Sequence, residues 1–133
     1  MRQRYYYVAS MDEKWEKIGR ETRSRWNHRH VSLNPNGSLV MNAVVYVELG
    51  SPAEVDLFYN WAEKTIGVLP APEATKDSYP VGSRGKSAKV VRALRLLQRC
   101  RIDMPHSLRF TAPEIDKDGM LKLDLRRTAP LQP

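Results

Sequence analysis

The pattern of apolar and polar positions first becomes regular between residues 10 and 26, SMDEKWEKIGRETRSRW. Trp15, Ile18 and Trp26 recur there at helical spacing and fall on one side of the segment. A serine and a glutamate at its start have the spacing of a capping box, and the first turn is acidic. We therefore predict an amphipathic N-terminal helix whose opposite side and C-terminal end are basic.

The next pattern is that of a tight hairpin followed by a short helix. Two extended segments, HVSLN and SLVMN, flank the turn sequence at residues 35–37, where an Asn-Gly pair favours positive φ. The run AVVYVEL that follows is rich in β-branched residues, but one strand over residues 38–49 would be unusually long. Asn42 is suited to cap a helix, and Leu49-Gly50 is a common helix ending. We predict a strand up to Met41 and a two-turn, mostly buried helix over residues 43–49.

A second hairpin and a linker follow. The segment EVDLFYN alternates apolar and polar positions, and TIGVLP comes after a short polar turn, which predicts two paired strands. Residues 70–78, PAPEATKDS, contain two prolines and have no periodicity, which is typical of a linker.

Beyond the linker, SYPVGS is expected to be extended and GKSAKVVRALRLLQRC to be helical. The apolar positions that would share one face of this helix are Val90, Val91, Leu94 and Leu97. HSLRFTA and MLKLDL, separated by the turn sequence at residues 116–119, predict a final hairpin. The last residues, RRTAPLQP, are expected to form a flexible tail.

The order of an extended segment, a helix, a short loop with a proline and a hairpin thus occurs twice. The predicted organisation is a strand and basic amphipathic helix over 1–30, a first strand-helix-hairpin repeat over 31–70, a linker over 71–77, a second and degenerate repeat over 78–125, and a flexible tail over 126–133.

The segment from residue 31 to residue 70 resembles the swapped-hairpin domain of the AbrB, MraZ and SpoVT transition-state regulators. In that family a strand, a glycine turn and a second strand precede a short helix ending in Leu-Gly, and a hairpin ending in proline follows. The matching positions are Gly37, Leu39, Val40, Met41, Leu49, Gly50, Val55, Leu57, Ile66, Val68 and Pro70. The second repeat corresponds more loosely, as in the tandem arrangement of MraZ.

The resemblance implies a β-rich α+β fold, a swapped-hairpin-like β-barrel of tandem repeats with an added N-terminal helix. It also implies a DNA-binding protein, either a small transcriptional regulator or an antitoxin-like or mobile-element accessory protein. The family commonly has Arg after the glycine and Pro before the helix, where this chain has Ser38 and Asn42. The family's DNA-contacting arginines therefore have no counterpart in the first repeat.

Assembly follows from the same comparison. One copy of about 40 residues buries too little apolar surface to fold alone. We therefore predict that residues 31–70 and 78–125 pack on each other as an intramolecular pseudo-dimer. The N-terminal helix would cover an exposed edge or face through Trp15, Ile18 and Trp26, and a homodimer is compatible with this core but not required by it.

Charge supports a polyanionic partner. The chain has 133 residues, the size of one domain, with 22 Lys and Arg against 15 Asp and Glu, which gives a net charge of +7. Two basic clusters are candidates for DNA contacts: Arg20, Arg23, Arg25, Trp26 and Arg29 at the end of the first helix, and Lys86, Lys89, Arg92, Arg95 and Arg99 on the polar face of the later helix. Each cluster is also compatible with an ordinary solvated helix face, and for the first cluster this alternative places Trp26 in the core.

Other functional classes lack a matching motif. The sequence His28-Arg29-His30 has no partner ligands at zinc-site spacing, and a single cysteine, Cys100, allows no internal disulfide. We find no nucleophile-base order, phosphate-cradling loop or cofactor motif, so we expect no enzyme, no metal and no cofactor. No apolar run is long enough for a membrane span, and we expect a cytoplasmic protein. The competing hypothesis is a protein-protein interaction or self-association module without nucleic-acid binding.

Overall fold

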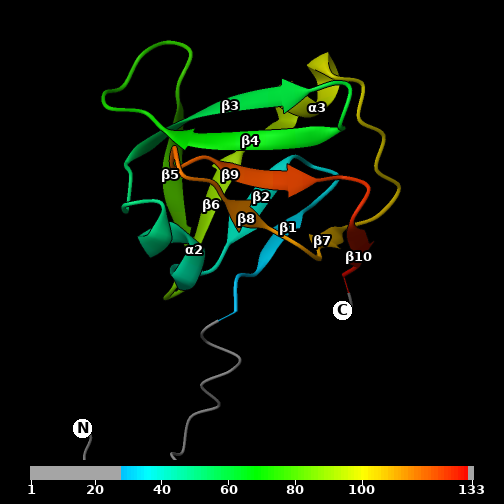
Figure 1. The fold of residues 1–133 in the computed structure, drawn as a ribbon, viewed down its shortest axis with the longest axis horizontal. Coiled ribbons are helices and arrows are strands. Elements are labelled where there is room, and N and C mark those ends of the chain that lie inside the picture. Colours follow the sequence, from blue (N-terminus) through cyan, green and yellow to red (C-terminus); the bar gives the residue numbers. More distant parts are fainter. Residues whose placement is uncertain (1–27, 132–133) are drawn as a thin grey trace, which may run out of the picture.

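A single curled, antiparallel sheet of ten strands with the shape of a half-barrel dominates the structure, a computed structural model that describes residues 28–131 (Figure 1). The strand and the helix predicted before residue 28 lie outside this range. The elements are β1 (Val31–Leu33), β2 (Ser38–Met41), α2 (Ala43–Glu48), β3 (Glu54–Asn60), β4 (Thr65–Pro70), β5 (Tyr79–Arg84), β6 (Ala88–Arg92), α3 (Leu94–Arg99), β7 (Leu108–Phe110), β8 (Glu114–Ile115), β9 (Leu121–Asp124) and β10 (Thr128–Pro130).

The local signals of the first segment are confirmed, but α2 is not the mostly buried helix that was predicted, since Val45 is its only buried residue and Val47 is 66% exposed. β1 and β2 form the predicted hairpin, with Gly37 at a φ of 92° in its turn. Asn42 caps α2, because its Oδ1 accepts the backbone N–H of Val45 at 3.3 Å. The predicted hairpin of β3 and β4 is paired over its whole length, from Val55 opposite Pro70 to Asn60 opposite Thr65.

The helix predicted from GKSAKVVRALRLLQRC is wrong in its first half. Residues 88–92 form β6, which pairs with β2 on one side and with β5 on the other, and only Leu94–Arg99 is helical. Strand pairing therefore overrides the helical periodicity of this stretch. The cations assigned to one helix face are consequently divided among a turn, a strand and a short helix.

Two further predictions near the C-terminus are corrected. HSLRFTA and MLKLDL do not pair with each other, because β7 lies between β1 and β10, and β9 lies between β4 and β8. The hairpin at the turn over residues 116–119 instead joins β8 to β9. The expected flexible tail is also wrong for Thr128–Pro130, which forms β10 at the edge of the sheet.

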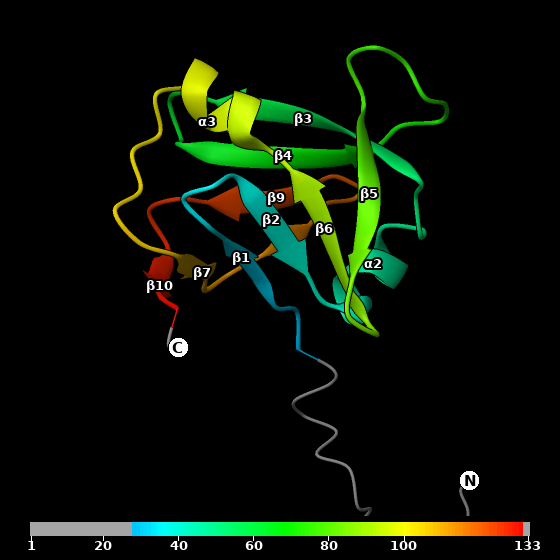
Figure 2. The same cartoon turned by 180° about the vertical axis from the view of Figure 1, so that it is seen from behind.

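The order of strands is β10-β7-β1-β2-β6-β5-β3-β4-β9-β8. The segments 31–70 and 78–125 pair with each other at four places: β1 with β7, β2 with β6, β3 with β5, and β4 with β9. The order of strands outward from the central pair, β2 and β6, is similar on both sides. On one side β1 pairs with β7, the strand that follows α3, and on the other side β5 pairs with β3, the strand that follows α2. Figure 2 shows β2 and β6 side by side between these two arms.

The core lies inside the curl of the sheet and is shared by both segments. Val31, Leu39 and Val55 contribute from the first segment, and Phe110 and Leu121 from the second, each with no more than 1% of its surface exposed. Burial of apolar side chains at this level is the main stabilising term of such a fold. Each segment therefore supplies only part of this core.

Candidate nucleic-acid interface

The short helix α3 is held against the sheet by its apolar side. Leu96 and Leu97 are buried, and the backbone N–H of Ala93 donates to the carbonyl oxygen of Gly37 at 2.7 Å. Gly37 has no room for a side chain there, since a Cβ would lie 2.5 Å from the backbone N and Cα of Leu94. The turn of the first hairpin therefore fixes the start of α3.

With that side packed, the other side of α3 faces solvent and is basic. Arg95 and Arg99 are one turn apart on α3 and are exposed. Arg92, at the end of β6, and Arg101, after the helix, are also exposed. We call these four arginines, Arg92, Arg95, Arg99 and Arg101, the α3 surface. Within residues 28–131, none of the four takes part in an ion pair.

Charge is unevenly distributed along the described chain, and the α3 surface belongs to its most basic part. Between residues 84 and 109 there are eight Lys and Arg and one acidic residue, Asp103, whereas residues 43–80 contain six acidic residues and two lysines. The helix α2 has no basic residue and one carboxylate, Glu48. Exposed cations without an ion pair among the described residues, such as the four arginines of the α3 surface, attract phosphate groups.

Arg101 has a backbone conformation that is unusual for its type. It has a φ of 54°, in the left-handed region that glycine adopts without cost. The corresponding position after α2 is Gly50, at a φ of 92°. The helix end at Arg101 is closed by a hydrogen bond from the N–H of Ile102 to the carbonyl oxygen of Leu97 at 2.9 Å. A long cationic side chain therefore stands where a glycine would be less strained, which is typical of a position with a function.

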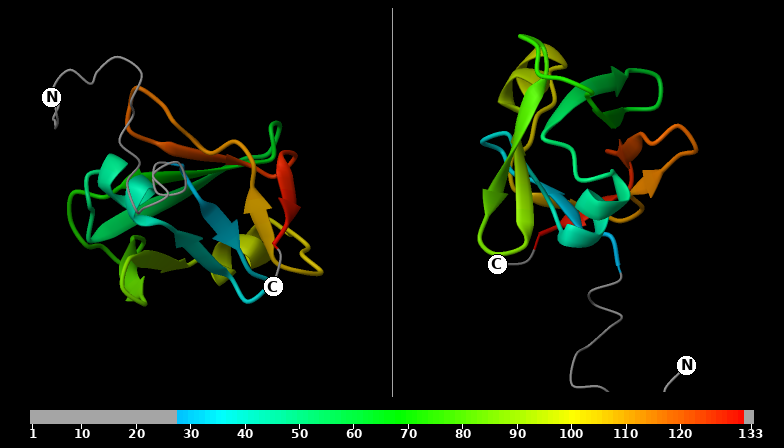
Figure 3. Two further views of the ribbon diagram at one scale, coloured as in Figure 1. Left: turned by 90° about the horizontal axis from the view of Figure 1, so that it is seen from below. Right: turned by 90° about the vertical axis from the view of Figure 1, so that its left-hand side faces the viewer.

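The other predicted contact residues of the later cluster do not join the α3 surface. Lys86 lies in the turn between β5 and β6, at the end of the hairpin next to α2 (Figures 2 and 3). Lys89 is half-buried, donates to Ser83 Oγ at 3.0 Å, and its Nζ lies 5.0 Å from the centre of the Tyr46 ring. Lys89 is thus engaged within the fold, because its ammonium already has an acceptor and an aromatic face.

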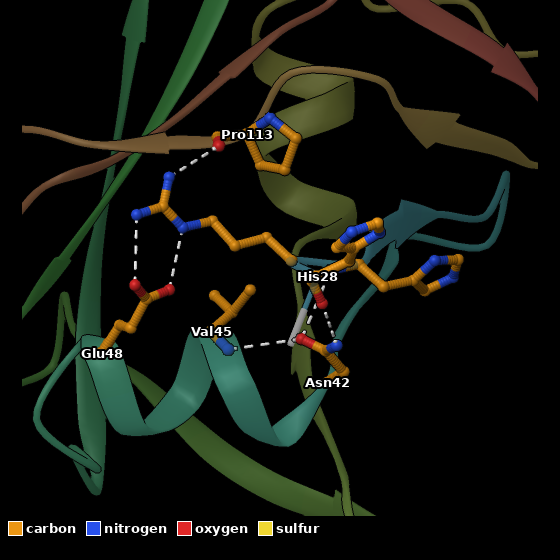
Figure 4. Close-up of polar contacts among 7 residues, drawn as sticks. His28, Asn42, Val45, Glu48 and Pro113 are labelled. Carbon is orange, nitrogen blue, oxygen red and sulfur yellow. Dashed lines mark hydrogen bonds and ion pairs between the residues drawn. The ribbon is translucent and has the colours of Figure 1, made fainter. Parts of the chain in front are cut away.

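Arg29 is the described member of the N-terminal cluster, while Arg20, Arg23, Arg25 and Trp26 lie outside the described residues. Its guanidinium binds two partners, Glu48 and Pro113, which are labelled in Figure 4. Nε and Nη2 donate to the Glu48 carboxylate at 2.8 and 3.1 Å, and Nη1 donates to the carbonyl oxygen of Pro113 at 3.1 Å. The hydrogen bonds to Glu48 raise the pKa of Arg29, and the same contact lowers the pKa of Glu48. Arg29 therefore joins β1 to α2 and to the loop before β8, and it is not free for phosphate.

Asn42 strengthens the same junction (Figure 4). Its Nδ2 donates to the carbonyl oxygen of His28 at 2.8 Å, and its Oδ1 accepts the N–H of His30 at 3.3 Å. An open groove of about 490 Å³ lies beside it, lined by His28, Arg29, Glu48 and residues 109–113. Because Glu48 neutralises Arg29 in its wall, this groove is a weaker anion site than the α3 surface.

The histidines of His28-Arg29-His30 have no metal-site geometry. Among residues 28–131, no group of three or more His, Cys, Asp and Glu side chains is placed to hold a metal ion. Burial, with a smaller contribution from the charge of Arg109, lowers the pKa of His30.

Sequence reasoning missed Arg101 and one exposed aromatic residue, Trp61. Trp61 lies in the turn between β3 and β4 with 63% of its surface exposed. Its signal was a tryptophan in a polar turn sequence, NWAEK, where no helical or strand period explains it. For Arg101 no sequence signal existed, because its place beside Arg95 and Arg99 depends on where α3 ends.

Comparisons with family models, curated proteins and solved structures find no significant match to this chain. In the range that the structure describes, no helix has the length and apolar character of a membrane span. The cytoplasmic location expected from the sequence stays a prediction.

Proposed function

We propose that this protein binds DNA and that the α3 surface supplies the principal contacts to the phosphate backbone. The observation that carries the proposal is the gathering of four exposed arginines at one end of the fold, without an ion pair among the described residues. Unpaired guanidinium groups bind phosphate oxygens in a bidentate manner, and their fixed placement on a packed helix lowers the entropy lost on binding. A role as a small transcriptional regulator, or as an antitoxin-like or mobile-element accessory protein, is part of this proposal.

The strand order supports a relation to the swapped-hairpin domains as a second part of the proposal. Each hairpin that precedes a helix pairs with the strand that follows the helix of the other segment, as β1 does with β7 and β5 does with β3. Two such units joined in one chain would produce this arrangement without a second subunit. In this interpretation the second unit contains an insertion, the β8–β9 hairpin, before its closing strand β10.

A titration of duplex DNA at several salt concentrations tests the DNA-binding proposal. Each phosphate neutralised by a cation contributes roughly −0.9 to the slope of log K against log salt. The double variant R95Q/R99Q should therefore bind more weakly and reduce the steepness of that slope by up to about 1.8. The matched control is K76Q, which removes a charge from the exposed loop between β4 and β5, at the far corner of the molecule from α3 (Figure 1).

The result that would overturn the proposal is equally direct. Absence of binding to both duplex and single-stranded DNA at low salt, or binding with the same salt dependence in R95Q/R99Q and K76Q, would exclude the α3 surface as a phosphate-binding site. The function then favoured is the interaction module, for which the exposed apolar side of α2 provides the specific observation, with Val47 66% exposed.

A further inference from the structure

Trp61 is the most exposed aromatic side chain among the residues that the structure describes, and its contact with the ring of Tyr59 leaves most of its surface accessible. With 63% of its surface accessible, it buries less than its size allows, and large aromatic residues are normally well covered. Phe58, the other large exposed aromatic residue of the same hairpin, is 47% exposed and belongs to the opposite face of β3 from Tyr59, because strand residues alternate. Trp61 therefore needs an explanation of its own.

The position of Trp61 is fixed by its surroundings. The hairpin is paired up to Asn60 opposite Thr65, and Asn60 Oδ1 accepts the N–H of Glu63 at 3.0 Å within the turn. The rings of Tyr59 and Trp61 meet edge-on, with centroids 5.0 Å apart and an interplanar angle of 82°. A side chain held in this way loses little conformational entropy when it contacts a ligand.

The turn of this hairpin lies at the same end of the molecule as α3. Figures 1 and 2 both show α3 beside the ends of β3 and β4 where the turn between them lies. Tyr59 packs against the core cluster that also contains Cys100, the C-cap residue of α3. Burial raises the pKa of Tyr59, with a smaller contribution from the charge of Cys100. The turn that carries the exposed indole and the end of α3, with Arg99 before Cys100 and Arg101 after it, thus lie at the same end of the molecule.

This pairing of an exposed aromatic ring with unpaired cations fits one chemistry in particular. The bases of single-stranded DNA expose their π-faces, and they stack on aromatic side chains while cations hold the phosphates. In a continuous duplex each base face is covered by its neighbours, so a protruding indole has no face to stack on except at an unpaired or extruded base.

We propose that Trp61 stacks on an unpaired base of DNA whose phosphates are bound by the α3 surface, so that the protein prefers single-stranded or locally unpaired DNA to a continuous duplex. This inference rests on the proposed function, and it assigns to the site a class of substrate that the charges alone do not distinguish. Arg99 and Arg101 hold the backbone on either side of the helix end, and Trp61 supplies the contact to the base.

The test uses the full chain with W61L and, as a matched control, F58L, which removes an exposed aromatic residue from the face of β3 opposite Tyr59. Three labelled probes are titrated at one salt concentration: a short oligothymidine, an abasic strand of the same length, and a duplex. W61L should weaken binding of the oligothymidine by roughly 5- to 150-fold, the range for loss of one stacked base. Binding of the abasic strand should not change, and F58L should bind all three probes like the parent protein.

A second readout does not depend on affinity. The sequence contains three tryptophans, so the variant W15F/W26F leaves Trp61 as the only source of indole fluorescence. Oligothymidine should quench this emission, and the abasic strand should not, because stacking requires a base.

The possible failures are distinguishable. If the parent protein binds none of the probes, the proposed function fails and this inference fails with it. If the parent protein binds DNA but W61L binds oligothymidine as well as the parent does, or weakens the abasic strand equally, the stacking role of Trp61 is overturned while DNA binding stands. Binding of the duplex more tightly than the oligothymidine by the parent protein also overturns the inference.

Discussion

Replacing Arg101 by glycine separates function from stability, because the two should change in opposite directions. Arg101 has a φ of 54°, and the left-handed conformation costs a residue with a Cβ about 1–2 kcal/mol. Glycine avoids this strain but loses about 0.5–1 kcal/mol through the greater freedom of the unfolded chain. The Arg101 side chain is exposed and forms no ion pair within the described residues, so little packing is lost. We therefore expect R101G to be more stable than the parent protein by about 0.5–1 kcal/mol.

The same change removes one cation from the α3 surface. If Arg101 contacts a phosphate, R101G should bind DNA more weakly, and the slope of log K against log salt should become less steep by about 0.9. Weaker binding by a more stable protein cannot be attributed to misfolding. Stability is measured by urea unfolding and affinity by titration at several salt concentrations.

The matched control is S51G. Ser51 follows α2 with a φ of 52°, so glycine relieves similar strain there without a change of charge. S51G should be stabilised and should bind DNA like the parent protein. The reasoning about Arg101 is refuted if R101G is less stable than the parent protein, or if its binding and salt dependence are unchanged.

Three other predictions concern the fold. G37A should lose about 2–5 kcal/mol of unfolding free energy, because its methyl group would collide with the backbone of Leu94 in addition to the strain at positive φ. The control G50A has the same φ with open space around it, and it should lose only about 1–2 kcal/mol. Equal shifts of the urea midpoint for the two variants would show that the hairpin turn does not press on α3. The thiol of Cys100 is buried, and burial raises its pKa. At neutral pH it should therefore react with a disulfide reagent far more slowly in the folded protein than in urea. Similar reaction rates under both conditions would contradict its burial. A fragment of residues 31–72 should show no cooperative unfolding by circular dichroism, since it lacks the partners of all four of its strands in the second segment; a stable folded fragment would mean that the two segments are independent.

The sequence by itself determined the elements whose causes are local. The Asn-Gly turn before β2, the cap at Asn42 and the alternating strands β3 and β4 each depend on residues within a few positions of one another, and each was found where the pattern predicted it. The cations near Arg95 and Arg99 were visible as a basic cluster for the same reason, although the helix assigned to them was too long.

Only the tertiary structure decided the elements that depend on distant partners. Val90 and Val91 fit a helical period as well as a strand, and pairing with β2 and β5 makes them part of β6. In the same way, β7 is placed by β1, and the last residues become β10 because β7 offers them an unpaired edge. The candidate site follows this rule as well. Arg101 and Trp61 are 40 positions apart in the sequence, and they share one end of the molecule because α3 and the β3–β4 hairpin pack against one core. The contacts that stabilise these elements join segments that are far apart in the sequence. No local pattern connects such segments, so only the folded structure shows which of them pack together.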